Sequence, residues 1–217
     1  MTAILFDLDG TIANSLPGIL DTTRRTYENF NLPWHKEEAL SLVGLPLLAV
    51  GEKLLGANHA QEYYDAYQKN FLSYRGADVE AYDGIPQLLQ KLTAQEIPLA
   101  IVTSKVRRGC LRTLKALDLT HYFKHLVTAS DGCGAKPDPE PVLCACQKLG
   151  KEPSETLFIG DSFFDIKSGQ AAGTTTCAVS WGAGKRADLL AYGPDFMAEN
   201  VPELDEIVFK WLRPFNK

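Results

Sequence analysis

The chain has 217 residues, of which 45% are hydrophobic and 23% are charged, and this composition is typical of a soluble globular protein. The net charge of -5, without any block rich in lysine or arginine, argues against nucleic-acid or anionic-membrane partners. The N-terminus, MTAILFDLDG, lacks the features of a signal peptide, and no apolar stretch is long enough to cross a membrane. We therefore expect a cytoplasmic protein with one core, or with a core and a modest insertion.

The first element is a short apolar run, AILF, which we interpret as a buried strand that ends in two acids, Asp7 and Asp9. Alternate residues of a strand share a face, so these two carboxylates would emerge together before the turn at Gly10. Two carboxylates in a poorly hydrated place need a cation or a shared proton. The alternative is an exposed loop in which both acids simply meet water.

Residues 14–81 contain helix-like segments at 18–30, 37–44 and 59–74 and no convincing strand. We interpret them as a helical insertion, and YDGIP at 82–86 marks the return of the chain to the core. Aromatic residues of the insertion mostly recur at helical spacing, which indicates a small core of its own with one or two side chains at a substrate entrance: Trp34, Tyr63, Tyr64, Tyr67, Phe71 and Tyr74.

From residue 82 onward, short apolar runs alternate with longer amphipathic stretches. The expected strands are 97–104, 125–130, 156–162 and 175–181, and the expected helices are 106–119, 139–150, 165–173 and 201–212. This alternation predicts an α/β fold with a doubly wound, mostly parallel sheet that is covered on both faces. We assign residues 1–13 and 82–217 to this core and residues 14–81 to an inserted all-helical domain.

Two polar stretches follow the second strand. Thr103 and Ser104 place hydroxyls and amides at the carboxyl end of that strand, which is the edge of a parallel sheet where ligands bind. Taken alone, Ser and Thr at the end of a strand are more often ordinary helix caps. Lys136 precedes Pro137 and Pro139, which stiffen the backbone before a helix, although a lysine in such a place is usually a solvated surface residue.

The next strand ends in Asp161, and Asp165 follows four residues later, a spacing that puts both carboxylates on one side of a helix. Asp161 could instead only cap that helix. Carboxylate oxygens are the ligands that Mg²⁺ prefers. Because parallel strands present their carboxyl ends at one edge, the four stretches together supply acids, a hydroxyl and a lysine around one crevice. That set of groups is suited to magnesium-assisted phosphoryl transfer.

The motifs FDLDGT, TSK, AKPDP and GDSFFD resemble, in this order and spacing, the four motifs of the haloacid dehalogenase-like (HAD) hydrolase superfamily. The insertion directly after FDLDGT is similar to the helical cap of the first type. The stretch GQAAGTTTCAVSWG also resembles the phosphoglycolate phosphatase-like branch, so the likeness covers nearly the whole chain.

The resemblance implies a role for each matching residue. Asp7 would be the nucleophile that forms an aspartyl-phosphate, and Asp9 would protonate the leaving oxygen and then deprotonate the hydrolytic water. Thr103, the backbone amide of Ser104, and Lys136 would hold the phosphoryl oxygens.

The resemblance also implies a metal site and a reaction type. Mg²⁺ would be bound by Asp7, the backbone carbonyl of Asp9, and Asp161, with Asp165 ligating through water or orienting the site. Thr11 would lie beside the substrate and support the turn. The dehalogenases and the phosphonate-cleaving relatives lack the second aspartate of the first motif, so the presence of Asp9 favours phosphate-ester chemistry.

Two other groups of residues are given structural interpretations. The cysteines form no CxxC pair and are expected to be reduced packing residues rather than metal ligands: Cys110, Cys133, Cys144, Cys146 and Cys177. Three arginines near Lys105, after the second strand, are expected to form a solvated helix face rather than a phosphate site: Arg107, Arg108 and Arg112.

We therefore expect a Mg²⁺-dependent phosphatase whose partner is a small-molecule phosphate ester, with phosphoglycolate as the first candidate. Alternatives are a sugar phosphomutase of the beta-phosphoglucomutase kind, pyrophosphate or nucleotide hydrolysis, and a non-catalytic binding protein on the same scaffold. A mutase would use a basic cap residue near residues 44–46, a loop expected to face the active site, but Leu45-Pro46-Leu47 offers none. The cap should rock on linkers near 13–17 and 79–84.

Overall fold

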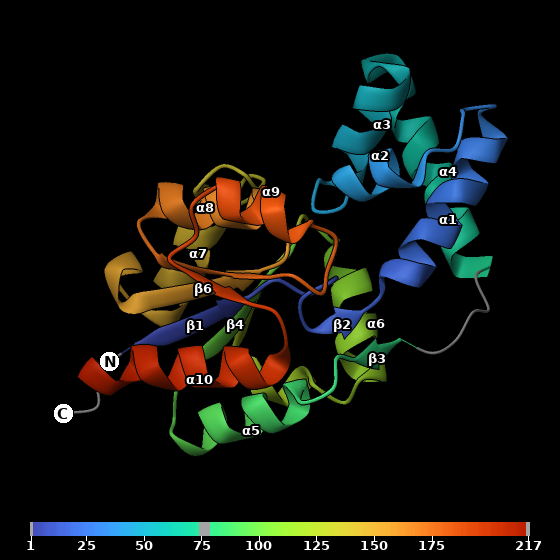
Figure 1. The fold of residues 1–217 in the computed structure, drawn as a ribbon. Coiled ribbons are helices and arrows are strands. Elements are labelled where there is room, and N and C mark those ends of the chain that lie inside the picture. Colours follow the sequence, from blue (N-terminus) through green and yellow to red (C-terminus); the bar gives the residue numbers. More distant parts are fainter. Residues whose placement is uncertain (1, 74–78, 216–217) are drawn as a thin grey trace.

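The computed structural model describes residues 2–73 and 79–215, so Tyr74, the last residue of the third expected cap helix, lies outside the described residues. Its centre is a six-stranded parallel sheet (Figure 1). In spatial order the strands are β5 (His125–Val127), β4 (Leu99–Val102), β1 (Ala3–Phe6), β6 (Thr156–Gly160), β7 (Thr175–Val179) and β8 (Phe196–Ala198). The predicted α/β fold with a doubly wound parallel sheet is confirmed.

The central strand β1 shows why an apolar run forms this sheet. Its four side chains are all fully buried, and alternate residues face opposite sides of the sheet. Ile4 and Phe6 pack in one hydrophobic cluster, whereas Ala3 and Leu5 pack in another. A strand that is buried on both faces reads as a continuous apolar run rather than as an alternating one.

Helices cover both faces of the sheet. The cluster that holds Ile4 and Phe6 contains buried residues of α5 (Ile85–Ala94), α6 (Arg107–Ala116) and α10 (Val201–Leu212). The opposite face is covered by α7 (Glu140–Leu149), α8 (Phe163–Ala172) and α9 (Arg186–Ala191). In Figure 1, α5 and α10 lie below the sheet, and α7, α8 and α9 lie above it.

The inserted segment forms a separate group of helices beside the carboxyl edge of the sheet (Figure 1). Its helices are α1 (Leu16–Asn29), α2 (Lys36–Ser41), α3 (Leu47–Leu55) and α4 (Ala60–Ser73). They pack around buried Tyr27, Leu42, Val50 and Tyr63. The segment leaves and re-enters the core through a two-stranded antiparallel ribbon of β2 (Ala13–Asn14) and β3 (Glu80–Ala81). We call the segment of helices α1–α4 the cap.

Several elements are absent from the sequence prediction. The sequence analysis did not predict the cap helix α3, the ribbon strands β2 and β3, or the core elements α5, α9 and β8. Residues 2–73 and 79–215 also contain four short 3-10 helices: Ala57–His59, Thr120–Tyr122, Pro153–Glu155 and Arg213–Phe215. Strands β2, β3 and β8 have only two or three residues, which is too few for a periodic pattern.

The expectation that all cysteines are reduced is wrong for two of them. The structure joins Cys133 by a disulfide to Cys144, which lies in α7. Cys110, Cys146 and Cys177 are free and buried, as packing residues would be.

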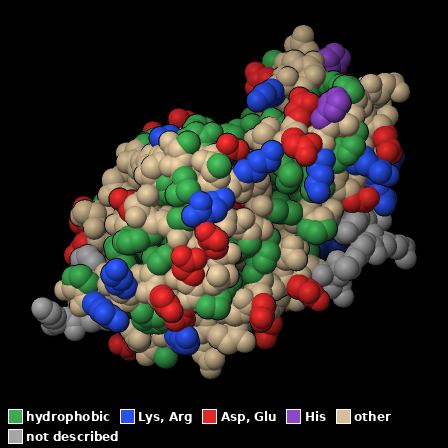
Figure 2. Space-filling model, in the orientation of Figure 1, with side chains coloured by type: hydrophobic (Ala, Val, Ile, Leu, Met, Phe, Trp, Pro, Cys, Tyr) green, Lys and Arg blue, Asp and Glu red, His purple; other side chains and the backbone are tan. Residues whose placement is uncertain are grey.

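The distribution of surface charge and the character of the helices can be compared with what nucleic-acid or membrane contact would require. On the face shown in Figure 2, acidic and basic side chains are interspersed over both the core and the cap. Among residues 2–73 and 79–215, none of the helices combines the length and the apolar character that crossing a bilayer requires.

Candidate active site

Asp7 follows β1 directly and lies at the carboxyl edge of the sheet. Its backbone N–H continues the ladder by donating to the carbonyl of Ile159 at 2.9 Å, and its side chain is buried. Gly10 closes the turn after the strand with a φ of 87°, and a Cβ there would collide with the carboxylate of Asp161. The glycine therefore lets the end of β1 and the end of β6 meet.

Lys136 is buried, contrary to the surface alternative, and its ammonium lies between two acids. Its Nζ is 2.7 Å from Asp7 Oδ1 and 2.6 Å from Asp165 Oδ1, and it also contacts the carbonyl of Val102 at 3.4 Å. Only about 2% of the lysine is exposed to solvent. Residues from three distant parts of the chain thus form one buried ion-pair network.

Asp161 is held at the end of β6 by two hydrogen bonds. The Thr11 hydroxyl donates to its Oδ1 at 2.9 Å, and the Ala183 backbone N–H donates to its Oδ2 at 2.6 Å. The residue does not cap the following helix, because Ser162 occupies the N-cap position of α8. Thr11 therefore orients a carboxylate as well as following the turn, and the contribution of Ala183 was not predicted from the sequence.

Asp165 completes the start of α8. Its Oδ2 accepts hydrogen bonds from the backbone N–H and hydroxyl of Ser162, so the two residues form a capping box. Its other oxygen contacts Lys136. Asp165 therefore fixes the helix start and the lysine together, and a direct role in metal binding remains a prediction.

Burial dominates the protonation of this network. It raises the pKa of Asp7 well above its usual value, although Lys136 opposes the shift. Burial, together with nearby Asp165, raises the pKa of Asp161 to about 7. Burial alone would lower the pKa of Lys136, but Asp165 and Asp7 together raise it above its usual value. Three carboxyl groups surround one ammonium, so a further cation would favour their ionised forms.

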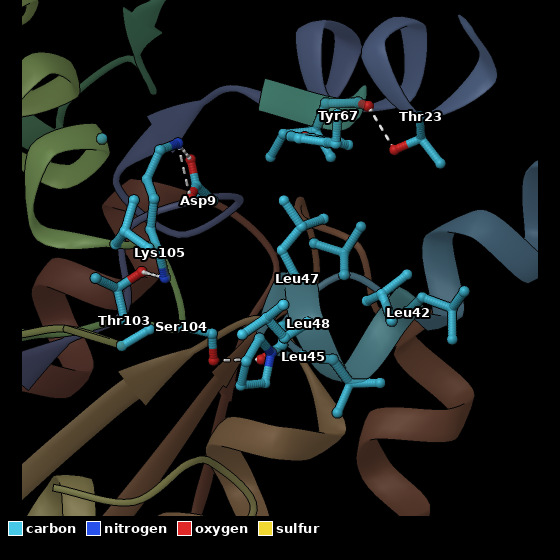
Figure 3. Close-up of a pocket in the computed structure, with 18 of the residues that line it drawn as sticks. Asp9, Thr23, Leu42, Leu45, Leu47, Leu48, Tyr67, Thr103, Ser104 and Lys105 are labelled. Atoms are coloured by element: carbon cyan, nitrogen blue, oxygen red, sulfur yellow. Dashed lines mark hydrogen bonds and ion pairs between the residues drawn. The ribbon is translucent and has the colours of Figure 1, made fainter. Parts of the chain in front are cut away.

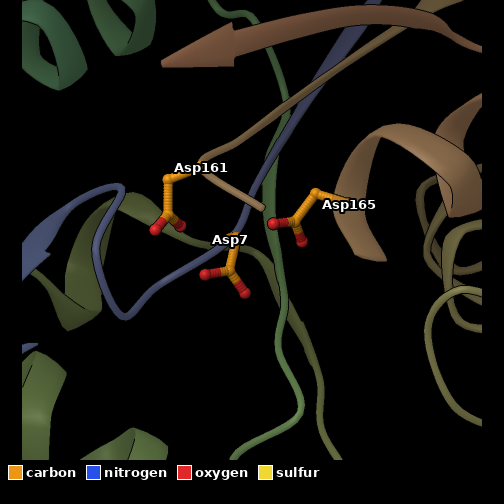
Figure 4. A group of neighbouring side chains, drawn as sticks. All are labelled: Asp7, Asp161 and Asp165. Atoms are coloured by element: carbon orange, nitrogen blue, oxygen red, sulfur yellow. The ribbon is translucent and has the colours of Figure 1, made fainter. Parts of the chain in front are cut away.

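The acids are close enough to share such a cation. Asp7, Asp161 and Asp165 each offer a carboxylate oxygen within 4.8 Å of the others, and all three are buried (Figure 4). In Figure 4 they come from the ends of two strands and the start of α8, with the Asp7 carboxylate between the other two. An all-oxygen donor set of this kind fits a hard divalent ion such as Mg²⁺. Asp9, expected to ligate through its backbone carbonyl, does not contribute its carboxylate to this group.

Thr103 and Ser104 follow β4 and line the same cavity as Asp7 and Asp161. Thr103 is buried, and its hydroxyl accepts from the backbone N–H of Lys105 at 3.2 Å. Ser104 donates its hydroxyl to the backbone carbonyl of Gly44 in the cap. Neither side chain caps α6, whose N-cap residue is Val106. The expected cap loop at 44–46 therefore does face the site.

Asp9 has partners that the sequence analysis missed. Lys105 Nζ lies 2.7 and 3.0 Å from its two carboxylate oxygens, and the Ser15 hydroxyl donates to Oδ1 at 2.7 Å. Only 16% of the Lys105 side chain is exposed, so this lysine belongs to the site and not to the solvated face expected of the neighbouring arginines. Arg107 also has a fixed partner, since its guanidinium pairs with Asp131. The backbone turn after β4, rather than helical periodicity, directs Lys105 toward Asp9.

The comparisons with known proteins agree with this geometry. Residues 4–179 match the family model described as haloacid dehalogenase-like hydrolase. The chain belongs to that family. It is 33% identical over 205 residues to pyrophosphatase PpaX of Oceanobacillus iheyensis, covering 94% of this chain and 95% of the relative. It is 35% identical over 208 residues to PpaX of Bacillus cereus, covering 94% of both chains.

Solved structures of family members show the same fold. A HAD-like family hydrolase from Streptococcus pneumoniae superposes with a TM-score of 0.82 at 28% identity, covering 94% of this chain and 96% of that one. A candidate phosphoglycolate phosphatase from Lactobacillus plantarum gives a TM-score of 0.84 at 27% identity, covering 95% and 99%. A candidate beta-phosphoglucomutase from Bacteroides vulgatus gives 0.83 at 25% identity, covering 99% and 89%. These comparisons establish the family of the chain, but the names of the relatives indicate different substrates.

Proposed function

We propose that this HAD-family hydrolase is a Mg²⁺-dependent phosphatase that hydrolyses a small phosphate monoester through an aspartyl-phosphate on Asp7. The proposal depends above all on the meeting of four side chains at one sheet edge. Lys136 forms ion pairs with Asp7 and Asp165, and carboxylate oxygens of these two acids and of Asp161 lie within 4.8 Å of one another. Asp7, Asp161 and Asp165 would hold Mg²⁺, which when bound supplies positive charge beside the phosphoryl oxygens.

In the first step, an Asp7 carboxylate oxygen attacks phosphorus and the bond from phosphorus to the ester oxygen breaks. Asp9 gives its proton to that oxygen, so the alcohol leaves neutral. Water then attacks the phosphoryl group, Asp9 takes the proton from the water, and the bond between phosphorus and Asp7 breaks. Inorganic phosphate leaves, and both aspartates return to their starting states.

The remaining residues position these groups. Lys136 contacts Asp7, and Thr103 and Ser104 line the cavity beside it. These three residues would hold the phosphoryl oxygens and stabilise their negative charge during the transfer. Lys105 and Ser15 hold Asp9 in place. Thr11 would act through Asp161 rather than on the substrate.

Pyrophosphate hydrolysis is the second candidate, because relatives named PpaX match nearly the whole chain. It would use the same nucleophile, with phosphate as the leaving group. A phosphomutase has less support, since residues 45–47 of the cap loop supply no basic side chain.

The covalent intermediate gives the sharpest test. The enzyme would be mixed with Mg²⁺ and p-nitrophenyl phosphate, quenched in acid and treated with borohydride, which reduces an acyl phosphate to an alcohol. Mass spectrometry of the peptide should locate homoserine at position 7. Asp7→Asn should give neither this product nor phosphate release, whereas Asp188→Asn on α9 should behave as the parent. Phosphate release by Asp7→Asn at the parental rate would contradict the nucleophile assignment.

A further inference from the structure

Acids of the candidate active site line a cavity of about 500 Å³ between the core and the cap. This volume is typical of small-molecule sites. Asp7, Asp9, Asp161 and Thr103 lie on its core side. If the phosphoryl group sits beside these residues, the rest of the substrate must occupy the space toward the cap. The lining on that side therefore reports on the alcohol that leaves.

The cap side of this cavity is mainly apolar, although the polar side chains of Thr23, Gln61 and Gln68 also line it. Four leucines from the end of α2 to the start of α3 lie together across the space from Asp9, Lys105 and Thr103, and Tyr67 lies above them (Figure 3): Leu42, Leu45, Leu47 and Leu48. Aromatic side chains of α4 also line it: Tyr63, Tyr64, Tyr67 and Phe71. This is more aromatic lining than the one or two side chains expected from the sequence. We call these eight residues the cap wall.

The tyrosine facing Asp9 is held in a neutral form. The Tyr67 hydroxyl is hydrogen-bonded to Thr23, as the dashed line in Figure 3 shows. Burial and then the charge of Asp9 raise the pKa of Tyr67 above its usual value. The residue therefore presents an uncharged ring to the cavity and brings no cation to it.

Charge on the cavity lining is almost entirely negative. Among the described residues that line it, Lys105 is the one cation, and its ammonium already contacts both oxygens of Asp9. Lys136 is paired with Asp7 and Asp165 and is not among the lining residues. A carboxylate or second phosphate on the leaving group would thus lose its hydration without gaining a free cation.

We propose that the leaving group is an uncharged, mainly apolar alcohol, aliphatic or aromatic, with more than two carbons, and that the cap wall selects it. This inference rests on the proposed phosphatase function and names its substrate class. It disfavours both phosphoglycolate, whose leaving group is a short anion, and pyrophosphate. Burying apolar carbon against the wall would contribute about fourfold in affinity for each methylene.

Turnover and binding would be measured separately. With Mg²⁺, kcat/KM for methyl, ethyl, propyl and butyl phosphate should rise, by at least about tenfold over the series. Phosphoglycolate and pyrophosphate should be turned over at least about tenfold less efficiently than butyl phosphate. In calorimetry with Mg²⁺, butylphosphonate, which cannot be hydrolysed, should bind more tightly than phosphonoacetate, its short anionic counterpart.

A pair of variants tests the wall itself. Leu47→Lys puts a cation into it and should shift the ratio of butyl phosphate to phosphoglycolate turnover toward phosphoglycolate by at least about tenfold. Leu72→Lys, at a position on the same cap that is 61% exposed and not part of the cavity, should leave that ratio unchanged. An unchanged ratio in Leu47→Lys would overturn the role of the wall.

The outcomes separate the two proposals. If esters are hydrolysed but phosphoglycolate or pyrophosphate is preferred, the phosphatase function stands and the inference is overturned. If no ester is hydrolysed but butylphosphonate still binds more tightly, the phosphatase function fails and the ligand class stands. If butylphosphonate does not bind more tightly than phosphonoacetate, the inference is overturned whatever the turnover.

Discussion

The core side and the cap side of the cavity are built in opposite ways. On the core side, Asp7 and Asp161 are buried carboxylates held by Lys136 and Thr11, each from a distant part of the chain. On the cap side, the wall is made of leucine and aromatic side chains, whose only polar groups are the hydroxyls of its tyrosines. Charged groups buried without partners are costly, so the core side tolerates little change in composition.

The cap wall has a different kind of tolerance. Apolar side chains of similar volume replace one another at small cost, so such a surface can change its shape without unfolding the protein. Under the proposed function, the buried charged groups of the core side would therefore set the reaction type, and the cap wall would select the substrate. Such a division of roles would allow members of one family to act on the different substrates that the relatives' names give.

The largest effect on stability and activity is expected when the Lys136 ammonium is removed from the buried ion-pair network of the core side. Lys136→Met should lower the free energy of unfolding by about 3–5 kcal/mol, because it leaves Asp7 and Asp165 buried beside each other without their ammonium. It should also lower kcat by at least about 100-fold. Urea denaturation in the presence of EDTA and steady-state phosphate release measure the two effects.

A matched control for this change lies on the surface. Lys91 pairs with Asp205 at 2.8 Å, and its side chain is 56% exposed. Lys91→Met should therefore change the unfolding free energy by less than about 1 kcal/mol and leave kcat unaltered. Equal destabilisation by the two lysine substitutions would show that burial of the network is not what matters.

Metal dependence should respond next. Asp161→Asn removes a charge from the acid group, and we expect the Mg²⁺ concentration for half-maximal activity to rise at least about tenfold. Thr11→Val, which removes only the hydrogen bond to Asp161, should give a smaller rise in the same direction. Titrations of phosphate release with Mg²⁺ measure both, and an unchanged midpoint in Asp161→Asn would exclude it from the metal site.

The core side was also the more predictable of the two from sequence. Asp7 and Asp161 follow apolar runs that form adjacent parallel strands, so their convergence follows from the topology. The ion pair of Lys105 with Asp9 was not predictable, because it depends on a turn that joins residues 96 positions apart. The residues of the cap that line the cavity could not be predicted for another reason. An apolar residue in the core of the cap and one that lines a cavity recur at the same helical spacing.

The extent of the cap remains a prediction, but its connection to the core has a clear physical basis. The ribbon pairs Ala13 with Ala81 and Asn14 with Glu80, at the boundaries expected from the loss and return of alternating strands. Two-residue strands give no pattern of their own in the sequence. The ribbon could not be predicted from either segment alone, because it forms only when the two ends of the insertion pair in the folded chain.

Lys105 lies where the two sides of the cavity meet, and its removal should have an intermediate effect. In Lys105→Met, Asp9 loses its ion pair and is held by Ser15 alone among its described side-chain partners. We expect kcat/KM for butyl phosphate to fall about 10- to 100-fold, because an alkoxide needs a proton to leave. p-Nitrophenyl phosphate, whose phenolate leaves without one, should lose less than about tenfold.

This dependence on the leaving group distinguishes positioning of an acid from simple phosphate binding. A lysine that only bound the phosphoryl group would affect both esters equally. Lys115→Met, at an exposed position in the last turn of α6, serves as the control and should change neither rate. Equal losses on the two esters in Lys105→Met would contradict the positioning role.

The smallest effect is expected on stability alone, at Asp131, a hydrogen-bonded carboxylate that takes no part in the proposed reaction. Asp131 accepts hydrogen bonds from Thr128 and pairs with Arg107. Burial opposes these contacts, but the Thr128 and Arg107 interactions prevail and lower the pKa of Asp131 below its usual value. Its stabilising contribution is therefore fully present above the ordinary aspartate pKa and is lost as the pH falls through the lowered value. Asp131→Asn should cost about 1–2 kcal/mol near pH 7.

That cost should shrink on acidification. When the parent and Asp131→Asn are compared by urea denaturation near pH 7 and near pH 3, the difference in unfolding free energy should be smaller at the lower pH, because the parental carboxylate is then partly protonated. Asp118→Asn, at an exposed position whose φ of 56° asparagine also tolerates, should differ little at either pH. A cost for Asp131→Asn that grows with acidity would reverse the sign of its linkage.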